Sequence, residues 1–145
     1  MLLDVNVLVV AHRVDAPDHA PMRSWVERLI HGEAAFGVPS IVLSGFLRIV
    51  THPGIFLGPA TLHEAFAFTE AIRSRPSFVE VSPGARHWSI FSSLCETADA
   101  RGNRIPDAYL AALAIESGSD WVTLDRGFAR FPDLRWRLPD ADPSR

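Results

Sequence analysis

Short apolar segments of this chain alternate with longer segments in which apolar residues recur every three or four positions. The short segments predict buried β-strands, and the longer ones predict helices with one apolar face. Strands are expected up to Leu3 and over residues 34–38, 78–81, 121–124 and 134–138. Helices are expected from residue 5 onward and over residues 18–31, 40–50, 61–75, 82–101 and 107–117. This alternation predicts the α/β class, with a parallel sheet covered by helices on both faces.

Several helix boundaries carry their own signals. Asp18 is expected to cap the helix that follows it, and Thr61 with Glu64 three residues later has the pattern of a capping box. Asp107 is expected to open a helix after a tight Gly-Asn-Arg-Ile-Pro connection. The segment 51–59 holds two prolines and two glycines, which predicts a loop.

Length and composition narrow the choice of protein class. With 145 residues, 48% of them hydrophobic, we expect a single domain over residues 1–138 followed by a flexible tail at 139–145. No apolar run approaches the roughly twenty residues needed to cross a bilayer, and Met1 is not followed by the basic head of a signal peptide. We therefore expect a cytoplasmic protein. Cys95 is the only cysteine, so no internal disulfide forms, and we interpret it as a core residue.

The charged residues exclude further classes. The net charge of −3 gives no general attraction to nucleic acid, so such binding would need a local basic patch or a bound cation. The chain contains no lysine, which excludes a P-loop, a Schiff base and the usual phosphotransfer domains. Six histidines lack the spacing of a zinc site, and no nucleophile elbow occurs.

Three aspartates remain as candidates for chemistry. Asp4 and Asp125 end predicted strands and Asp107 begins a predicted helix, so all three can meet at the carboxyl edge of the sheet, where ligands bind in open α/β folds. Helix capping would explain any one of them alone. Asn6 and Thr123 are expected to face the same way as Asp4 and Asp125, by alternation along a strand. Clustered carboxylates repel one another, so a hard cation, Mg²⁺ or else Mn²⁺, is expected between them.

Three blocks of the sequence resemble those of a known family. They are LLDVNVL at residues 2–8, GNRIPDAYLAALA at 102–114 and VTLDRGFARF at 122–131, with FLRIVTHP at 46–53 as a further likeness. They look like the signature blocks of PIN-domain ribonucleases, and within these the chain is most similar to VapC toxins of bacterial type II toxin–antitoxin pairs. The resemblance implies a three-layer α/β/α sandwich. It also implies an Mg²⁺-dependent endoribonuclease that cleaves tRNA or rRNA and restrains growth, a small VapB-like antitoxin and a homodimer.

Carried over to this sequence, the resemblance makes Asp4, Asp107 and Asp125 the catalytic and metal-binding acids, with Asn6 and Thr123 as polar neighbours. The chain departs from the family at two positions. Gly45 stands where many relatives have a glutamate, three residues before Arg48, and Gly127 stands where relatives often have another acid. Three carboxylates favour one metal over two. They also keep open a second reading, a catalytically weak or inactive PIN-fold module that only binds its antitoxin.

Two interpretations concern the partners. The apolar helices over Met22–Ile30 and Leu62–Ile72 would offer grooves for an antitoxin helix, or would simply be core. Some arginines near the acids in the sequence are candidates for contacts with RNA phosphates, with no single one favoured: Arg48, Arg101, Arg104, Arg126 and Arg130.

Overall fold

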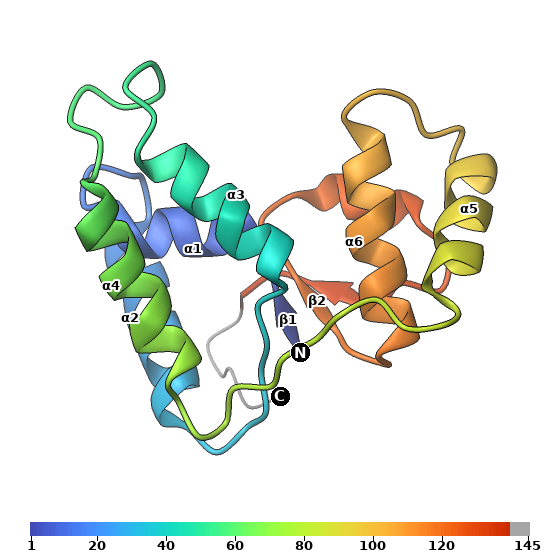
Figure 1. Cartoon of the computed structure of the whole chain (residues 1–145), viewed down its shortest axis with the longest axis horizontal. Coiled ribbons are helices and arrows are strands. Elements are labelled where there is room, and N and C mark those ends of the chain that lie inside the picture. The colour runs from blue at the N-terminus through green and yellow to red at the C-terminus, as the bar shows by residue number, and fades with distance from the viewer. Residues whose placement is uncertain (140–145) are drawn as a thin grey trace.

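The computed structural model describes residues 1–139 and is shown in Figure 1. Its elements follow one another as β1 (Leu2–Leu3), α1 (Val5–His12), α2 (His19–His31), α3 (Ser40–Val50), α4 (Leu62–Arg73), α5 (His87–Thr97), α6 (Arg104–Glu116), β2 (Trp121–Val122), the 3₁₀ helix η1 (Arg126–Arg130) and β3 (Trp136–Arg137). Helices α1 to α4 lie on one side of the strands, and α5 and α6 on the other (Figure 1). The expected three-layer α/β/α arrangement is confirmed.

The middle layer is a parallel sheet. Strand β1 pairs with β2 and β2 with β3, so that Leu2 lies opposite Trp121. Two single parallel bridges extend it on the other side of β1, because Leu2 pairs with Gly37 and Phe36 pairs with Phe78. The five predicted apolar segments therefore do lie side by side, but their regular pairing is shorter than predicted. Helices α1 and α3 begin within three residues of β1 and of Gly37, which ends the pairing there.

The apolar face of α2 belongs to the core. Its five apolar side chains are each at most 9% exposed: Met22, Trp25, Val26, Leu29 and Ile30. Helix α6 buries small residues, namely Ala108, Ala111, Ala112 and Ala114, together with Leu113. Small side chains let a helix approach its neighbours closely. The part of α6 from Ala108 onward is thereby packed into the core, whereas residues 104–106 at its start are exposed.

Helix α5 is shorter than the predicted range 82–101. Before it, the backbone N–H groups of Gly84 and Arg86 donate to the Glu116 carboxylate over 2.7 and 2.8 Å, which ties this segment to α6 in a non-helical form. After it, Asp99 takes the left-handed conformation, with φ of 44°, which a helix does not allow. The pattern of apolar residues indicates neither the hydrogen bonds to Glu116 nor the left-handed conformation of Asp99.

One predicted helix start is wrong, one predicted cap lacks its side-chain hydrogen bond, and the predicted capping box is confirmed. Helix α6 begins at Arg104, so Asp107 lies in its first turn and does not open it. Asp18 precedes α2 but has φ of 61°, and its side chain makes no capping hydrogen bond. The capping box is present, because Thr61 N–H donates to Glu64 Oε2 and Glu64 N–H donates to Thr61 Oγ1.

Three further expectations concern Cys95, membrane-spanning segments and the extent of the domain. Cys95 is partly buried on α5 and packs against the core. Among the described helices, none has both the length and the apolar character that crossing a membrane requires. The single domain over residues 1–138 stays a prediction, and the tail expected at 139–145 lies, from residue 140 on, outside the described residues.

Candidate active site

Asp4 lies at the point where β1 gives way to α1, and only 4% of it is exposed. Its carboxylate caps α1 by accepting the N–H of Val5 over 2.6 Å. It also accepts the hydroxyl of Thr123 over 2.6 Å, across 119 residues of sequence. Because β1 and β2 are parallel neighbours, their carboxyl ends bring these two side chains together. The predicted convergence of Asp4 and Thr123 is therefore observed.

Asn6 completes a polar network with Asp4 and Thr123. Its amide nitrogen donates to Asp4 Oδ2 and to Thr123 Oγ1, both over 3.0 Å, and its Oδ1 accepts the N–H of Leu124. The reason predicted for this convergence was wrong: Asn6 lies on helix α1, so strand alternation does not apply to it. Thr123 Oγ1 also accepts the N–H of Asp125, which fixes the start of the loop after β2.

Asp125 and Asp107 border this network from two other elements. Asp125 is exposed and caps η1, where its Oδ1 accepts the N–H of Gly127 over 2.7 Å. Asp107 projects from the first turn of α6, with 30% of its side chain exposed. Its Oδ2 lies 3.8 Å from Nη1 of Arg130. In the described part of the chain, this ion pair is the one polar contact of the Asp107 carboxylate.

The three carboxylates act on one another electrostatically. Burial raises the pKa of Asp4, while the Thr123 hydroxyl and the Val5 N–H oppose this rise, and the charges of Asp107 and Asp125 add to it. Burial likewise raises the pKa of Asp107, the charge of Asp125 raises it further, and Arg130 lowers it. Placing negative charges near one another out of water is unfavourable, so a bound cation would stabilise this edge of the sheet.

The acids are near neighbours rather than a closed cage. Within residues 1–139, no three His, Cys, Asp or Glu side chains are drawn together tightly enough to form a metal site as they stand. Asp4 is held rigidly by three hydrogen bonds, whereas Asp125 is exposed and Asp107 is partly so. A cation bound here would keep part of its water shell, as Mg²⁺ usually does.

The two departures from the family pattern have different surroundings. A Cβ added to Gly45 on α3 would meet only Val5 Cγ2, at 3.8 Å, which is ordinary contact. Gly45 therefore leaves open space and is not required by packing. A Cβ added to Gly127 would come within 2.6 Å of Arg130 Nη2 and within 2.8 Å of Asp125 Oδ1. The space beside Gly127 is already filled by the guanidinium of Arg130.

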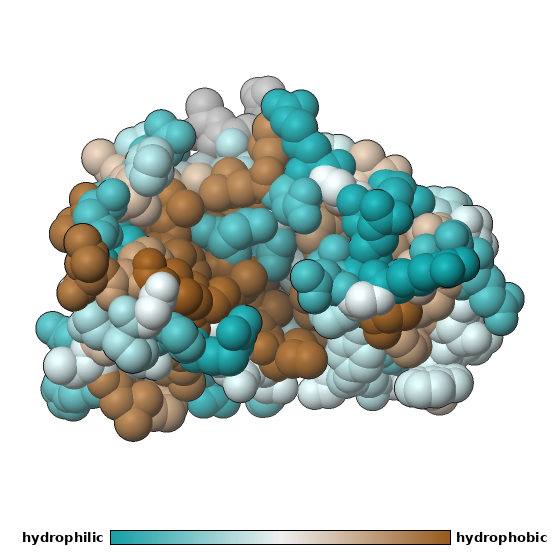
Figure 2. Space-filling view, turned by 90° about the horizontal axis from the view of Figure 1, so that it is seen from above, coloured by the Kyte–Doolittle hydropathy of each residue, from teal (hydrophilic) through white to brown (hydrophobic). Residues whose placement is uncertain are grey.

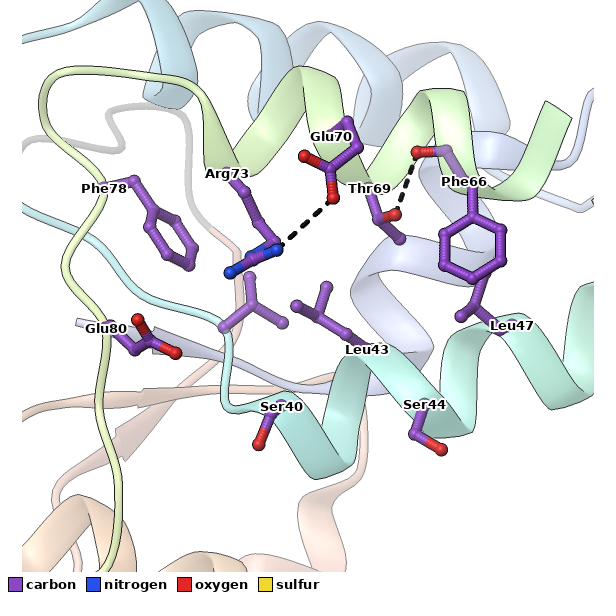
Figure 3. A pocket seen from close by; sticks show the side chains of 11 residues that line it. Ser40, Leu43, Ser44, Leu47, Phe66, Thr69, Glu70, Arg73, Phe78 and Glu80 are labelled. Atoms are coloured by element: carbon purple, nitrogen blue, oxygen red, sulfur yellow. Dashed lines mark hydrogen bonds and ion pairs between the residues drawn. The ribbon is translucent and has the colours of Figure 1, made fainter. Parts of the chain in front are cut away.

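A separate apolar pocket lies between α3 and α4 (Figure 3). Leu43 and Leu47 of α3 and Phe66 of α4 line it, and a Glu70–Arg73 ion pair of 3.3 Å lies at its side. None of the candidate acids contributes to it. Seen from above, hydrophobic side chains gather over the half of the molecule that holds α1 to α4, and hydrophilic ones over the half that holds α6 (Figure 2). Of the two predicted grooves, the α2 face is core, whereas α4 buries Ala65 and Ile72 but leaves Leu62 and Phe66 exposed.

Comparison with known proteins agrees with this architecture. Residues 1–134 match the PIN domain family. Ribonuclease VapC43 of Mycobacterium tuberculosis is 45% identical over 139 residues, which are 96% of this chain and 95% of that protein. Ribonuclease VapC25 of the same organism is 46% identical over 138 residues, which are 95% and 97% of the two chains.

Solved structures share the fold. A chain of VapBC2 from Rickettsia felis, bound to a DNA fragment from its promoter, superposes with a TM-score of 0.67 at 22% identity, covering 96% of this chain and 98% of that one. A chain of DNA-bound VapBC from Salmonella typhimurium gives 0.63 at 21% identity, covering 94% and 96%. The family match and the two mycobacterial relatives are decisive: this chain belongs to the PIN-domain family and, within it, to the VapC ribonucleases.

Proposed function

We propose that this VapC ribonuclease hydrolyses RNA phosphodiester bonds at Asp4, Asp107 and Asp125, with Mg²⁺ or Mn²⁺ bound between them. The observation that carries the proposal is the placement of Asp4. It is buried, bonded to the end of the neighbouring strand, and within the field of two further carboxylates. Without a bound cation, a buried carboxylate close to two others lowers the stability of the fold. Groups in such unfavourable environments are concentrated at functional sites.

The donors present fit a hard divalent cation. All three candidate ligands are carboxylates, and their neighbours offer an amide and a hydroxyl, so the set consists of oxygen donors as Mg²⁺ and Mn²⁺ prefer. Asp107 has no hydrogen bond within the described residues, which leaves its oxygens available for a ligand. VapC ribonucleases of the PIN family depend in general on a divalent metal. The choice of Mg²⁺ over Mn²⁺ belongs to the proposal.

Each residue then has a defined task. When bound, the cation would act as a Lewis acid and lower the pKa of a coordinated water. Thr123, Asn6 and the Val5 N–H hold the Asp4 carboxylate in one orientation, so it need not reorganise when a ligand arrives. Asp107 is positioned by its place on α6 next to the buried Ala108, and Asp125 by its cap on η1.

The test compares Asp4→Asn and Asp107→Asn with wild type in RNA cleavage, with Mg²⁺ and with a chelator. Asp133→Asn is the matched control, because Asp133 is exposed and has φ of 66°, a conformation that asparagine tolerates. We expect both site variants to lose cleavage and the control to keep it. The metal assignment is wrong if both site variants cut RNA as well as wild type does, or if wild type still cuts RNA when the chelator has removed the metal.

The same experiment addresses the binding-module reading, which the two glycines support. A wild-type protein that leaves tRNA and rRNA intact with either metal, yet still binds its antitoxin, would be such a module. The RNA class, the homodimer and the cytoplasmic location are part of this proposal and follow from the family alone.

We further propose that a small VapB-like antitoxin covers the pocket between α3 and α4. Phe66 is 47% exposed beside Leu43 and Leu47, which suits the apolar face of a partner helix. Co-expression of the antitoxin with Phe66→Glu should fail to relieve growth arrest, while Val79→Glu, at a similarly exposed position outside the residues lining this pocket, should allow relief. Equal relief in both variants would place the antitoxin elsewhere.

A further inference from the structure

The guanidinium of Arg130 lies beside two of the three candidate acids, Asp107 and Asp125. Its Nη1 is 3.8 Å from Asp107 Oδ2, and its Nη2 lies over Gly127, beside Asp125. Arg130 ends η1 and Asp125 caps the same short helix, so one five-residue element with its cap carries both a carboxylate and the guanidinium near it. The sequence offers Arg130 only as one of five candidate arginines, because its contact with Asp107 joins η1 to α6, which are separate elements.

Gly127 is what makes room for this guanidinium. Its φ does not lie in the left-handed region, which among the described glycines is occupied by Gly102 and Gly118. The backbone at position 127 therefore does not require glycine. A Cβ there would approach Arg130 Nη2 to 2.6 Å, so a side chain at this position would push the guanidinium from where it lies. A side chain at 127 and the observed position of Arg130 exclude each other.

We propose that Arg130 is the fixed positive charge of the active site, and that it limits the site to one divalent cation while offering a phosphate contact to RNA. The inference rests on the proposed function. Three carboxylates and one guanidinium leave two negative charges, which a single divalent cation neutralises. A second cation would need a further acid, such as the one that relatives often have at position 127. In this chain the guanidinium of Arg130 lies beside that position and would repel the cation.

The geometry allows Arg130 to change partners. The Arg130 and Asp107 side chains are 32% and 30% exposed, and 3.8 Å is too long for a hydrogen bond, so their pairing is weak. A divalent cation can therefore take Asp107 from it. The released guanidinium keeps its planar fork of donors, which matches two oxygens of a phosphate. Arg130 would then hold the RNA backbone next to the bound metal.

The test measures Mn²⁺ binding without RNA, by electron paramagnetic resonance of free Mn²⁺, together with RNA cleavage. The variants are Arg130→Gln and Arg130→Lys. The control is Arg23→Gln, which removes the same charge from an exposed Arg23–Glu27 pair on α2. We expect wild type to bind one Mn²⁺ per chain. Arg130→Gln should bind it about two- to fivefold more tightly, the scale of one partly exposed ion pair, and lose about tenfold or more in kcat/KM.

Arg130→Lys distinguishes the effect of the positive charge from that of the planar guanidinium. It should bind Mn²⁺ about as wild type does, because the charge remains, but should cleave RNA poorly, because an ammonium lacks the fork. The control should match wild type in both measurements. Thermal unfolding in chelator shows whether each variant is folded, and the lysine variant carries the test if the glutamine variant is not.

Three results would overturn the inference: two Mn²⁺ per wild-type chain, unchanged or weaker Mn²⁺ binding in Arg130→Gln, or unchanged cleavage in that variant. These three results can be distinguished from the results expected if the proposed function is wrong. In that case wild type itself would bind no Mn²⁺, or Asp4→Asn would bind it equally well. If Asp4→Asn abolishes binding while Arg130→Gln behaves as wild type, only the role of Arg130 is wrong.

Discussion

Replacing Thr123 by valine tests the network that holds Asp4. Thr123 is fully buried, and valine has nearly the same shape, so the change removes a hydroxyl and little else. That hydroxyl donates to Asp4 over 2.6 Å and accepts from Asn6 Nδ2 and from the N–H of Asp125, both over 3.0 Å. A hydrogen bond to a charged group contributes about 1.5–3 kcal/mol and a neutral one about 1 kcal/mol.

The expected loss in the free energy of unfolding is about 3 kcal/mol, since Asp4 keeps its bonds to Val5 and Asn6, and Asp125 is exposed to water. For a chain of this length, that lowers the Tm by about 10 °C. Thr123→Ser is the control. It keeps the hydroxyl and loses one methyl group, which costs about 0.8 kcal/mol. Urea unfolding in chelator at pH 7 measures both differences.

The pH dependence gives a second check on the same variant. The pKa of Asp4 is raised by burial above the value of an unfolded aspartate, so the folded protein binds its proton more tightly. Its contribution to stability is therefore greatest below the unfolded pKa and falls as pH rises through the folded pKa. The Thr123 hydroxyl opposes that rise, so its loss should cost more at pH 7 than near pH 4. A Thr123→Val variant within about 0.5 kcal/mol of wild type at pH 7 would refute the account, because the bonds to Thr123 would then contribute too little to hold Asp4.

Three further predictions follow from other contacts. In wild type, Mn²⁺ at a hundred times its Kd should stabilise the fold by about 2.7 kcal/mol, and Asp4→Asn should show no such shift in Tm. Burial lowers the pKa of His12, whose ring packs edge-on against the stacked rings of Phe46 and Phe68, so its contribution to stability is present above the unfolded pKa and lost as pH falls through the folded one; His12→Leu should flatten the fall in Tm between pH 7 and pH 5. Phe46→Ala should cost about 3–5 kcal/mol in urea unfolding, because the ring is fully buried and leaves a cavity.

Features that depend on near neighbours in the chain could be predicted from the amino-acid sequence. The capping box of Thr61 and Glu64 is made by groups three residues apart, and the apolar stripe of α2 follows from helical spacing. The order of apolar segments also determined the layer architecture, because parallel strands must be joined by helices. The convergence of Asp4 with Thr123 followed from the same rule about strand ends.

Contacts between groups far apart in the sequence depend on how the helices and strands pack. The sequence predicted that Asn6 and Thr123 share one edge of the sheet, but not that Asn6 lies on a helix and donates to Thr123, 117 residues away. The start of α6 before Asp107 and the tie of Glu116 to the segment before α5 depend on packing between elements. The position of Arg130 over Gly127 has the same origin. Local spacing determines which face of a helix or strand a side chain lies on, but only the packing of distant elements determines which side chain lies opposite it. The electrostatics of this site depend on such long-range contacts.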